Sequence, residues 1–169
     1  AQFTLGIMYA KGEGVIQSDS LSFTYSKLAA DQGFADAQHN VGNGYANGIG
    51  VVQSDTEAFK YYKLAADQGN CQSQFNLGIM YAQGTGVIQS GTLAFKFYKL
   101  SAEAGYAAAQ SNVGLYYAKG TDAEQSFTNA RVWWTKAAKQ GDEKAIVWLK
   151  RLDEQEGIKT TSSSSNCSK

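Results

Sequence analysis

The residue types that usually carry catalysis are scarce in this sequence. It holds one histidine, His39, and two cysteines, Cys71 and Cys167. A zinc site needs three or four Cys, His or acidic ligands, and the chain has no second histidine with which to build one. A Cys–His nucleophilic pair would require Cys71 to meet His39 beside a third, orienting group. A surface histidine and ordinary thiols are the simpler interpretation, so we expect no enzyme activity, no metal and no cofactor.

Gly-x-Gly pairs such as Gly12 and Gly14 resemble the loops that cradle phosphates. In this chain, however, they follow a helical pattern, whereas a nucleotide site needs such a loop between a strand and a helix. The chain also has 15 basic and 15 acidic residues. A protein that neutralises the phosphates of a nucleic acid would show a basic excess, so we expect no nucleic-acid partner.

Targeting signals are also weak. No run approaches the length of about 18 apolar residues that a membrane span needs, so no membrane insertion is expected. The first 30 residues lack the basic start and apolar stretch of a signal peptide, which favours a cytoplasmic location. The sequence does not begin with Met and is interpreted as a fragment. Asn166-Cys167-Ser168 fits the glycosylation pattern, but one match in a polar tail indicates little.

The strongest feature is an internal repeat. A shift of 36 residues superimposes nearly the whole chain without a gap, and most of the 18 glycines recur in columns, in a chain that has no proline. The aligned columns include Gly6, Gly42, Gly78 and Gly114; Tyr9, Tyr45, Tyr81 and Tyr117; Gly12, Gly48, Gly84 and Gly120; and Gly33, Gly69, Gly105 and Gly141. A repeat of this period indicates stacked supersecondary units.

Each unit is predicted to contain two helices. In the second unit Ala37, Val41 and Tyr45 are spaced by four, as along one face of a helix over about 34–46. Glycines at 48 and 50 break that helix, and the capping-box pattern of residues 54–57 begins the next, which ends at 69.

A glycine recurs inside every first helix. Gly42 is the second unit's copy, and glycine at such a position costs about 0.5–1 kcal/mol relative to Ala. Its recurrence predicts that the partner helix crosses there too closely for a β-carbon. We expect the small Ala65 and Ala66 to make that approach.

The recurring residues resemble a known family. Leu77-Gly78-Ile79-Met80-Tyr81 with the loop to Val87, followed by the A-x-x-(Y/F)-(Y/W)-K-x-A-A-x-x-G pattern, is similar to the Sel1-like repeat, a relative of the tetratricopeptide repeat. The resemblance extends over about residues 1–155. It implies an all-α, α/α superhelical solenoid of about four 36-residue two-helix repeats, acting as an adaptor or scaffold without chemistry of its own. The expected repeats are 1–33, 34–69, 70–105 and 106–141.

The fourth unit and the C-terminal region depart from the pattern. The loop after Gly120 has Asp122 where the second glycine stood, so its turn is expected to differ. Trp148 stands where earlier units have asparagine, and Lys150 replaces the helix glycine. Because a solenoid needs an atypical terminal unit to cover its last apolar face, we interpret 142–156 as a capping helix. Residues 157–169 are predicted to form a polar Ser/Thr-rich tail.

A partner site is predicted on the concave face, which first helices line in solenoids of this type. The expected groove residues are Phe3, Ile7, His39, Asn40, Asn43, Phe75, Asn76, Ile79, Ser111, Asn112 and Leu115. They include an asparagine ladder at 40, 76 and 112, whose amides could pair with a peptide backbone or bond across to the neighbouring repeat. They also include an apolar strip at 3, 7, 75, 79 and 115, which could bury partner surface or pack between first helices.

These features together predict a protein–protein interaction scaffold that holds a peptide or protein segment in its groove. The alternative is self-association, in which exposed solenoid ends stack end to end to give a homo-oligomer.

Overall fold

Residues 1–157 are described in the computed structural model of the chain. The predicted tail after Gly157 and the possible glycosylation site at Asn166 lie outside the described residues. Within residues 1–157 the chain forms nine α-helices and no strand, which confirms the all-α class. The helices are α1 (Gln2–Lys11), α2 (Asp19–Ala30), α3 (Ala35–Asn47), α4 (Asp55–Asp67), α5 (Cys71–Gln83), α6 (Gly91–Glu103), α7 (Ala107–Lys119), α8 (Phe127–Lys139) and α9 (Glu143–Gln155).

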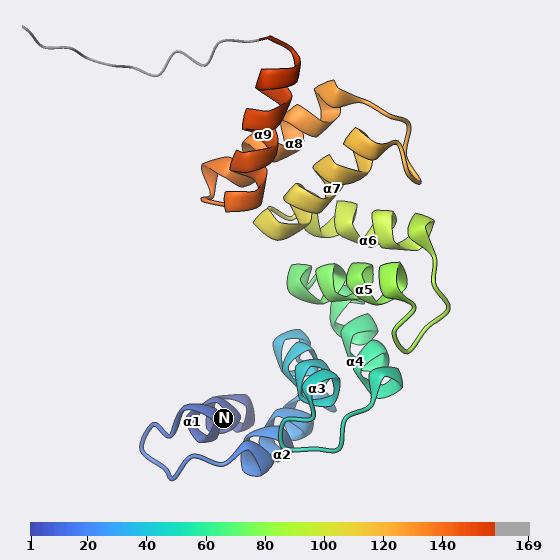
Figure 1. Ribbon diagram of the computed structural model, residues 1–169. Helices are drawn as coiled ribbons and strands as arrows, with labels where there is room; N and C mark the ends of the chain where they lie inside the picture. Colours follow the sequence, from blue (N-terminus) through green and yellow to red (C-terminus); the bar gives the residue numbers. More distant parts are fainter. Residues whose placement is uncertain (158–169) are drawn as a thin grey trace, which may run out of the picture.

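Each helix packs mainly against its neighbours along the chain. The pairs α1–α2, α3–α4, α5–α6 and α7–α8 form the repeats, and α2–α3, α4–α5, α6–α7 and α8–α9 join one repeat to the next. The stack bends into an arc, and α1 and α9 lie at its two ends (Figure 1). This is the predicted α/α solenoid.

The sequence signals for helix ends act as expected. First helices end at a glycine in the left-handed region, such as Gly48 with φ 69°. Second helices begin at serine caps, and the Ser54 hydroxyl accepts a hydrogen bond from the Glu57 N–H at 3.3 Å. The capping box is only half formed, because the Ser54 N–H donates to the Tyr45 carbonyl at 2.9 Å. That bond folds the loop back onto the first helix.

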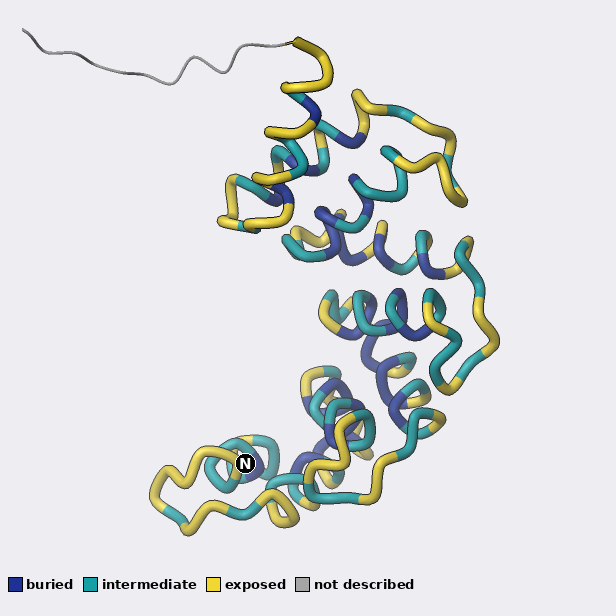
Figure 2. The backbone as a smooth tube through the Cα atoms, viewed as in Figure 1, coloured by how far each residue is buried: buried dark blue, intermediate teal, exposed yellow. Residues whose placement is uncertain are grey.

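Buried residues run through the stack as a series of clusters between helices (Figure 2). Val41, Leu77 and Val113 occupy one position of successive first helices and are fully buried. Each helix pair is too small to bury such a residue alone. Packing between neighbouring repeats therefore holds the fold together.

The recurring helix glycines do mark close contacts, although the neighbour differs from the one predicted. A Cβ added to Gly42 or Gly78 would lie 2.6 Å from the ring of Tyr62 or Tyr98. At the third site, Gly114, it would meet the Trp134 ring. The aromatic ring of the partner helix, and not the Ala65–Ala66 pair, covers the glycine.

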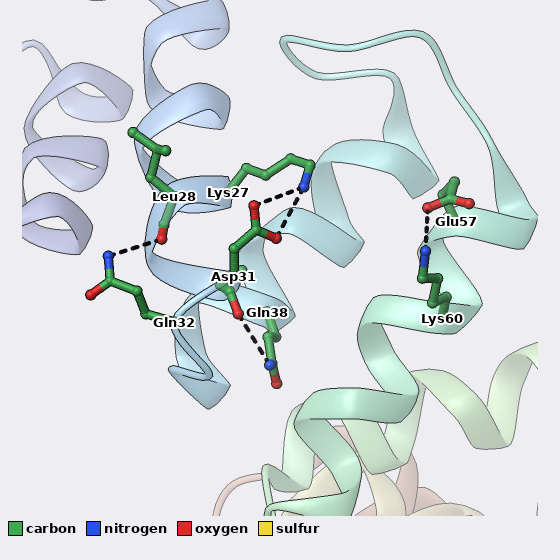
Figure 3. Close-up of polar contacts among 8 residues, drawn as sticks. Lys27, Leu28, Asp31, Gln32, Gln38, Glu57 and Lys60 are labelled. Atoms are coloured by element: carbon green, nitrogen blue, oxygen red, sulfur yellow. Dashed lines mark hydrogen bonds and ion pairs between the residues drawn. The ribbon is translucent and has the colours of Figure 1, made fainter.

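Glutamines tie consecutive repeats together. Gln38 Nε2 donates to the Ala30 carbonyl of the preceding repeat at 3.3 Å (Figure 3), and its Oε1 accepts from Gln68 Nε2 at 2.7 Å. Gln110 and Gln140 repeat the side-chain pairing at 2.9 Å. In the third repeat the matching pair is Gln74 and Ala104, and the buried Gln74 Oε1 has no hydrogen-bond partner.

Restoring the missing amide should stabilise the protein. We expect Ala104→Gln to raise the free energy of unfolding by about 1 kcal/mol, because it supplies a donor to a buried acceptor. Ala104→Glu is the matched control, since a carboxylate of similar shape cannot donate. Urea unfolding monitored by circular dichroism measures both variants. Equal stability of the Gln and Glu variants would contradict this assignment.

The fourth loop keeps the turn that the sequence led us to doubt. Asp122 has φ 56°, in the same left-handed region as its counterpart Gly86 at 66°. At the earlier joint, Gly86 packs closely on Asp55 at the start of α4. Between repeats three and four the aspartate is on the loop and the glycine is on the helix. The Asp122 carboxylate packs over Gly91 at the start of α6 and accepts a hydrogen bond from Thr92 Oγ1 at 3.1 Å. The exchange leaves room for the side chain.

The last helix closes the stack on one side only. Asp142 caps α9 by accepting from the Ala145 N–H at 2.8 Å, and it also accepts from the Ser111 hydroxyl at 3.1 Å. The Trp134 and Trp148 rings stack with centroids 5.7 Å apart. On the outer face of α9, Ile146 and Val147 remain about half exposed, so the cap still shows apolar surface.

Candidate partner-binding surface

The predicted groove residues lie on the first helices, and most are partly buried. Phe3 and Ile7 are on α1; His39, Asn40 and Asn43 on α3; Phe75, Asn76 and Ile79 on α5; Ser111, Asn112 and Leu115 on α7. His39 and Ser111 are buried, and the other nine are partly exposed. The structure gathers several of them into two pockets, each beside successive first helices.

The first of these, which we call the 3–4 pocket, lies between repeats three and four and measures about 560 Å³. Its apolar wall contains Phe75, Ile79 and Tyr98, and Ser111 and Asn112 supply polar groups. The start of α9 forms one rim, with Asp142, Glu143 and Lys144. A pocket with an apolar wall and a few polar groups suits an apolar side chain whose backbone needs hydrogen-bond partners.

The second, the 1–2 pocket, lies between repeats one and two and measures about 480 Å³. It brings together Ile7, Asn40 and Asn43 from the predicted set. The remaining lining residues come mainly from the start and middle of α2 and from the ends of α1 and α3: Gly6, Ala10, Lys11, Asp19, Ser22, Phe23, Ser26, Gly44 and Ile49.

The other predicted residues lie elsewhere. Phe3 lines a third pocket at the N-terminal edge together with Phe34. Leu115 is partly buried on α7. The apolar strip is interrupted at α3, where His39 and Asn43 occupy the positions that Phe75 and Ile79 hold on α5.

His39 lies inside a joint between repeats two and three and is not at the surface as expected. Its Nδ1 is 2.8 Å from the Ser73 hydroxyl on α5, and its Nε2 is 3.0 Å from Asn43 Nδ2. The Tyr62 hydroxyl donates to Asn43 Oδ1 at 2.7 Å, so the Asn43 amide N–H points at the ring. Nε2 is therefore the acceptor, and the proton of the neutral imidazole is on Nδ1.

This network makes the joint sensitive to acid. Burial lowers the pKa of His39 below its ordinary value of 6.5, while the Asp36 carboxylate acts in the opposite direction. Because the folded-state pKa lies below the unfolded one, stability is complete above about pH 6.5 and falls as the pH drops through the folded pKa. We expect the free energy of unfolding to decrease from pH 7 to pH 5, and His39→Gln to flatten that decrease. An equal slope in both proteins would show that other groups cause it.

The asparagine ladder faces tyrosine hydroxyls of the preceding repeat. The Asn76 side chain lies at the Tyr62 hydroxyl, and Asn112 lies at that of Tyr98. Burial raises the pKa of both tyrosines to about 12, so both phenols stay protonated. At these two positions the amide lies next to the neighbouring repeat, and the role of the ladder in binding a partner stays a prediction.

Sequence reasoning missed several lining residues. Tyr98 is buried in the core and also lines the 3–4 pocket, and the residues from 142 to 144 were expected only to cap the stack. Ser26 was not singled out, although the residue 36 positions later is tyrosine. The small serine at a position where another repeat has tyrosine could have indicated open space beside the first repeat.

Neither a metal centre nor a membrane span is evident in the described part of the chain. Within residues 1–157 no group of three or more His, Cys, Asp or Glu side chains could hold a metal ion. No helix there is long and apolar enough to cross a bilayer.

The geometry defines an α/α repeat protein, and the comparisons identify its family. Residues 1–34, 35–70, 71–106 and 107–142 each match the Sel1 repeat, so the chain belongs to the Sel1 repeat family. Proteins of this family generally mediate protein–protein interactions and are generally non-catalytic. A comparison with curated proteins gives no match.

Two solved structures show the same fold. A Sel1 repeat protein from Oxalobacter formigenes is 30% identical with a TM-score of 0.86, over 92% of this chain and 62% of its own. A protective antigen of uropathogenic Escherichia coli strains, which displays an SLR fold, is 32% identical with a TM-score of 0.87, over 92% of this chain and 33% of its own. The chain thus spans less than two thirds of either relative. The repeat boundaries and the cytoplasmic location stay predictions.

Proposed function

We propose that this chain is a scaffold that binds a peptide or protein segment along the first helices α1, α3, α5 and α7. The observation that carries the proposal is the 3–4 pocket, in which Phe75 and Ile79 are partly exposed beside the Asn112 amide. Burying such apolar surface contributes roughly 25 cal/mol per Å². An amide at the edge fixes the path of a backbone, because it both donates and accepts.

The test starts from a defined probe. Peptides selected from a random library on the wild-type chain are titrated calorimetrically against Phe75→Ala/Ile79→Ala. We expect the affinity to fall at least 10-fold, as is usual when apolar anchors of an interface are truncated. Circular dichroism verifies that the variant stays folded.

The matched control is Leu64→Ala/Leu100→Ala, which removes two leucines that are 43% and 40% exposed on second helices. We expect this control to bind like the wild type. A Phe75/Ile79 variant of unchanged affinity, or a leucine control that loses as much, would overturn the proposal.

A second candidate function is self-association through the ends of the stack. It is supported by the half-exposed Ile146 and Val147 on α9 and by Phe34, 58% exposed at the other end. Sedimentation across a dilution series tests it, with Ile146→Ser/Val147→Ser as the variant. A monomer at every concentration excludes stacking.

A further inference from the structure

Whether space is open beside each first helix depends on the residue at one position of the second helix, which is 26, 62, 98 or 134 in the four repeats. The residue that faces the helix glycine is Tyr62, Tyr98 or Trp134 in repeats two to four, and Ser26 in repeat one. In the later repeats an aromatic ring covers the glycine. In the first repeat the nearest atom to an added Cβ on Gly6 is the Ser26 hydroxyl, at 2.9 Å.

The polar tips of the three rings have partners nearby. The Tyr62 hydroxyl donates to Asn43, and Trp134 Nε1 donates to the Ser111 carbonyl at 3.0 Å. The residue 14 positions after each ring lies on the next repeat, and its type depends on whether the ring is a tyrosine or a tryptophan. Asn76 and Asn112 lie at the hydroxyls of Tyr62 and Tyr98, and Trp148 stacks on Trp134.

The first repeat has the surroundings of such a ring without the ring. Where Tyr62 or Tyr98 would stand, the chain has only Ser26, and the 1–2 pocket of about 480 Å³ opens there. Gly6 and Ile7 line it from α1 and Phe23 from α2. Asn40 also lines it, in the same column as Asn76 and Asn112. In the later repeats an asparagine at this position is paired with a tyrosine, whereas Trp148 is paired with a tryptophan. The asparagine at position 40 therefore favours a phenol as the occupant of the 1–2 pocket.

We propose that the 1–2 pocket receives a tyrosine side chain of the bound partner. The ring lies beside Ser26, between Ile7 and Phe23, and its hydroxyl bonds the Asn40 amide. The single Lys11 at the rim already pairs with Glu13 at 3.5 Å, so the site suits the neutral phenol. The inference rests on the proposed function in placing the tyrosine on a partner, but the pocket itself is testable without one.

The probe is p-cresol, which is the tyrosine side chain as a free molecule. Nuclear magnetic resonance titration of the wild-type chain should give saturable shifts at the amides of Gly6, Ser26 and Asn40. The expected Kd is about 1 mM, which is reasonable for a ligand of this size. Toluene, which lacks the hydroxyl, should bind at least 5-fold more weakly, and Asn40→Leu should remove that preference.

Ser26→Tyr is the decisive variant, because it places the chain's own phenol in the pocket. We expect it to fold and to abolish p-cresol binding. Thr24→Tyr adds the same residue at an exposed position of α2 and should leave binding intact. Absence of saturable shifts in the wild type, or equal binding by Ser26→Tyr, overturns the proposal. Loss of peptide binding in Phe75→Ala/Ile79→Ala concerns the other pocket, so the two ideas fail separately.

Discussion

Replacing Trp134 by alanine should lower the free energy of unfolding by about 3–5 kcal/mol, the range for truncating a buried aromatic residue. Trp134 is only 3% exposed, and its Nε1 donates to the Ser111 carbonyl. Its ring also covers Gly114 and stacks on Trp148. The substitution thus removes contacts within repeat four and contacts with α9 at once. Amide hydrogen exchange should show α9 and α8 opening first.

The control keeps the ring and removes the donor. Trp134→Phe leaves an aromatic face on Gly114 but leaves the Ser111 carbonyl without this hydrogen bond, so a cost of about 1–2 kcal/mol is expected. Urea unfolding gives both values. If the Ala and Phe variants were equally stable, ring packing would not be what holds the terminal repeat.

The solenoid was predictable because its evidence is a column of identical residues. Glycines at one register and serines at another fix where helices end and begin, and the structure agrees with them at Gly48 and Ser54. Stacking follows because two short helices cannot bury Val41 or Leu77 alone. These inferences need only the period and the chemistry of single residues.

Contacts made by side-chain ends were harder to predict. Periodicity places His39 on the face expected to form the groove, yet Ser73, Asn43 and burial keep its ring inside the joint. The length of a tyrosine, which reaches Gly42 before the alanines do, is not visible in spacing. Asp122 adopts the same left-handed turn as the glycines of the other loops, and its side chain fits because the facing residue, Gly91, has no side chain. In such pairs the residue allowed at one position depends on a residue of another repeat, and a pattern read within one repeat does not show this dependence.

The Gly78 contact offers a second large effect. Gly78→Ala should reduce the free energy of unfolding by about 3 kcal/mol, because the new methyl group would stand 2.6 Å from the Tyr98 ring. In an ordinary helix Gly→Ala raises the free energy of unfolding by about 0.5–1 kcal/mol. The sign of the measured change therefore distinguishes a blocked position from an ordinary one. Thermal and urea unfolding provide the measurement.

Repeat one supplies the control for this contact within the same chain. Gly6→Ala places its methyl group 2.9 Å from the Ser26 hydroxyl, which can rotate away, and 3.2 Å from the Ser22 carbonyl oxygen and the Ser26 backbone nitrogen, which need to shift only slightly, so its cost should be smaller. Copying that arrangement into repeat three with Tyr98→Ser opens space for the methyl group. Tyr98→Ser alone is costly, but in the double variant the two losses should fall short of additivity by about 1–3 kcal/mol. Strict additivity would mean that the ring does not oppose the methyl group, and that another contact keeps glycine at this position.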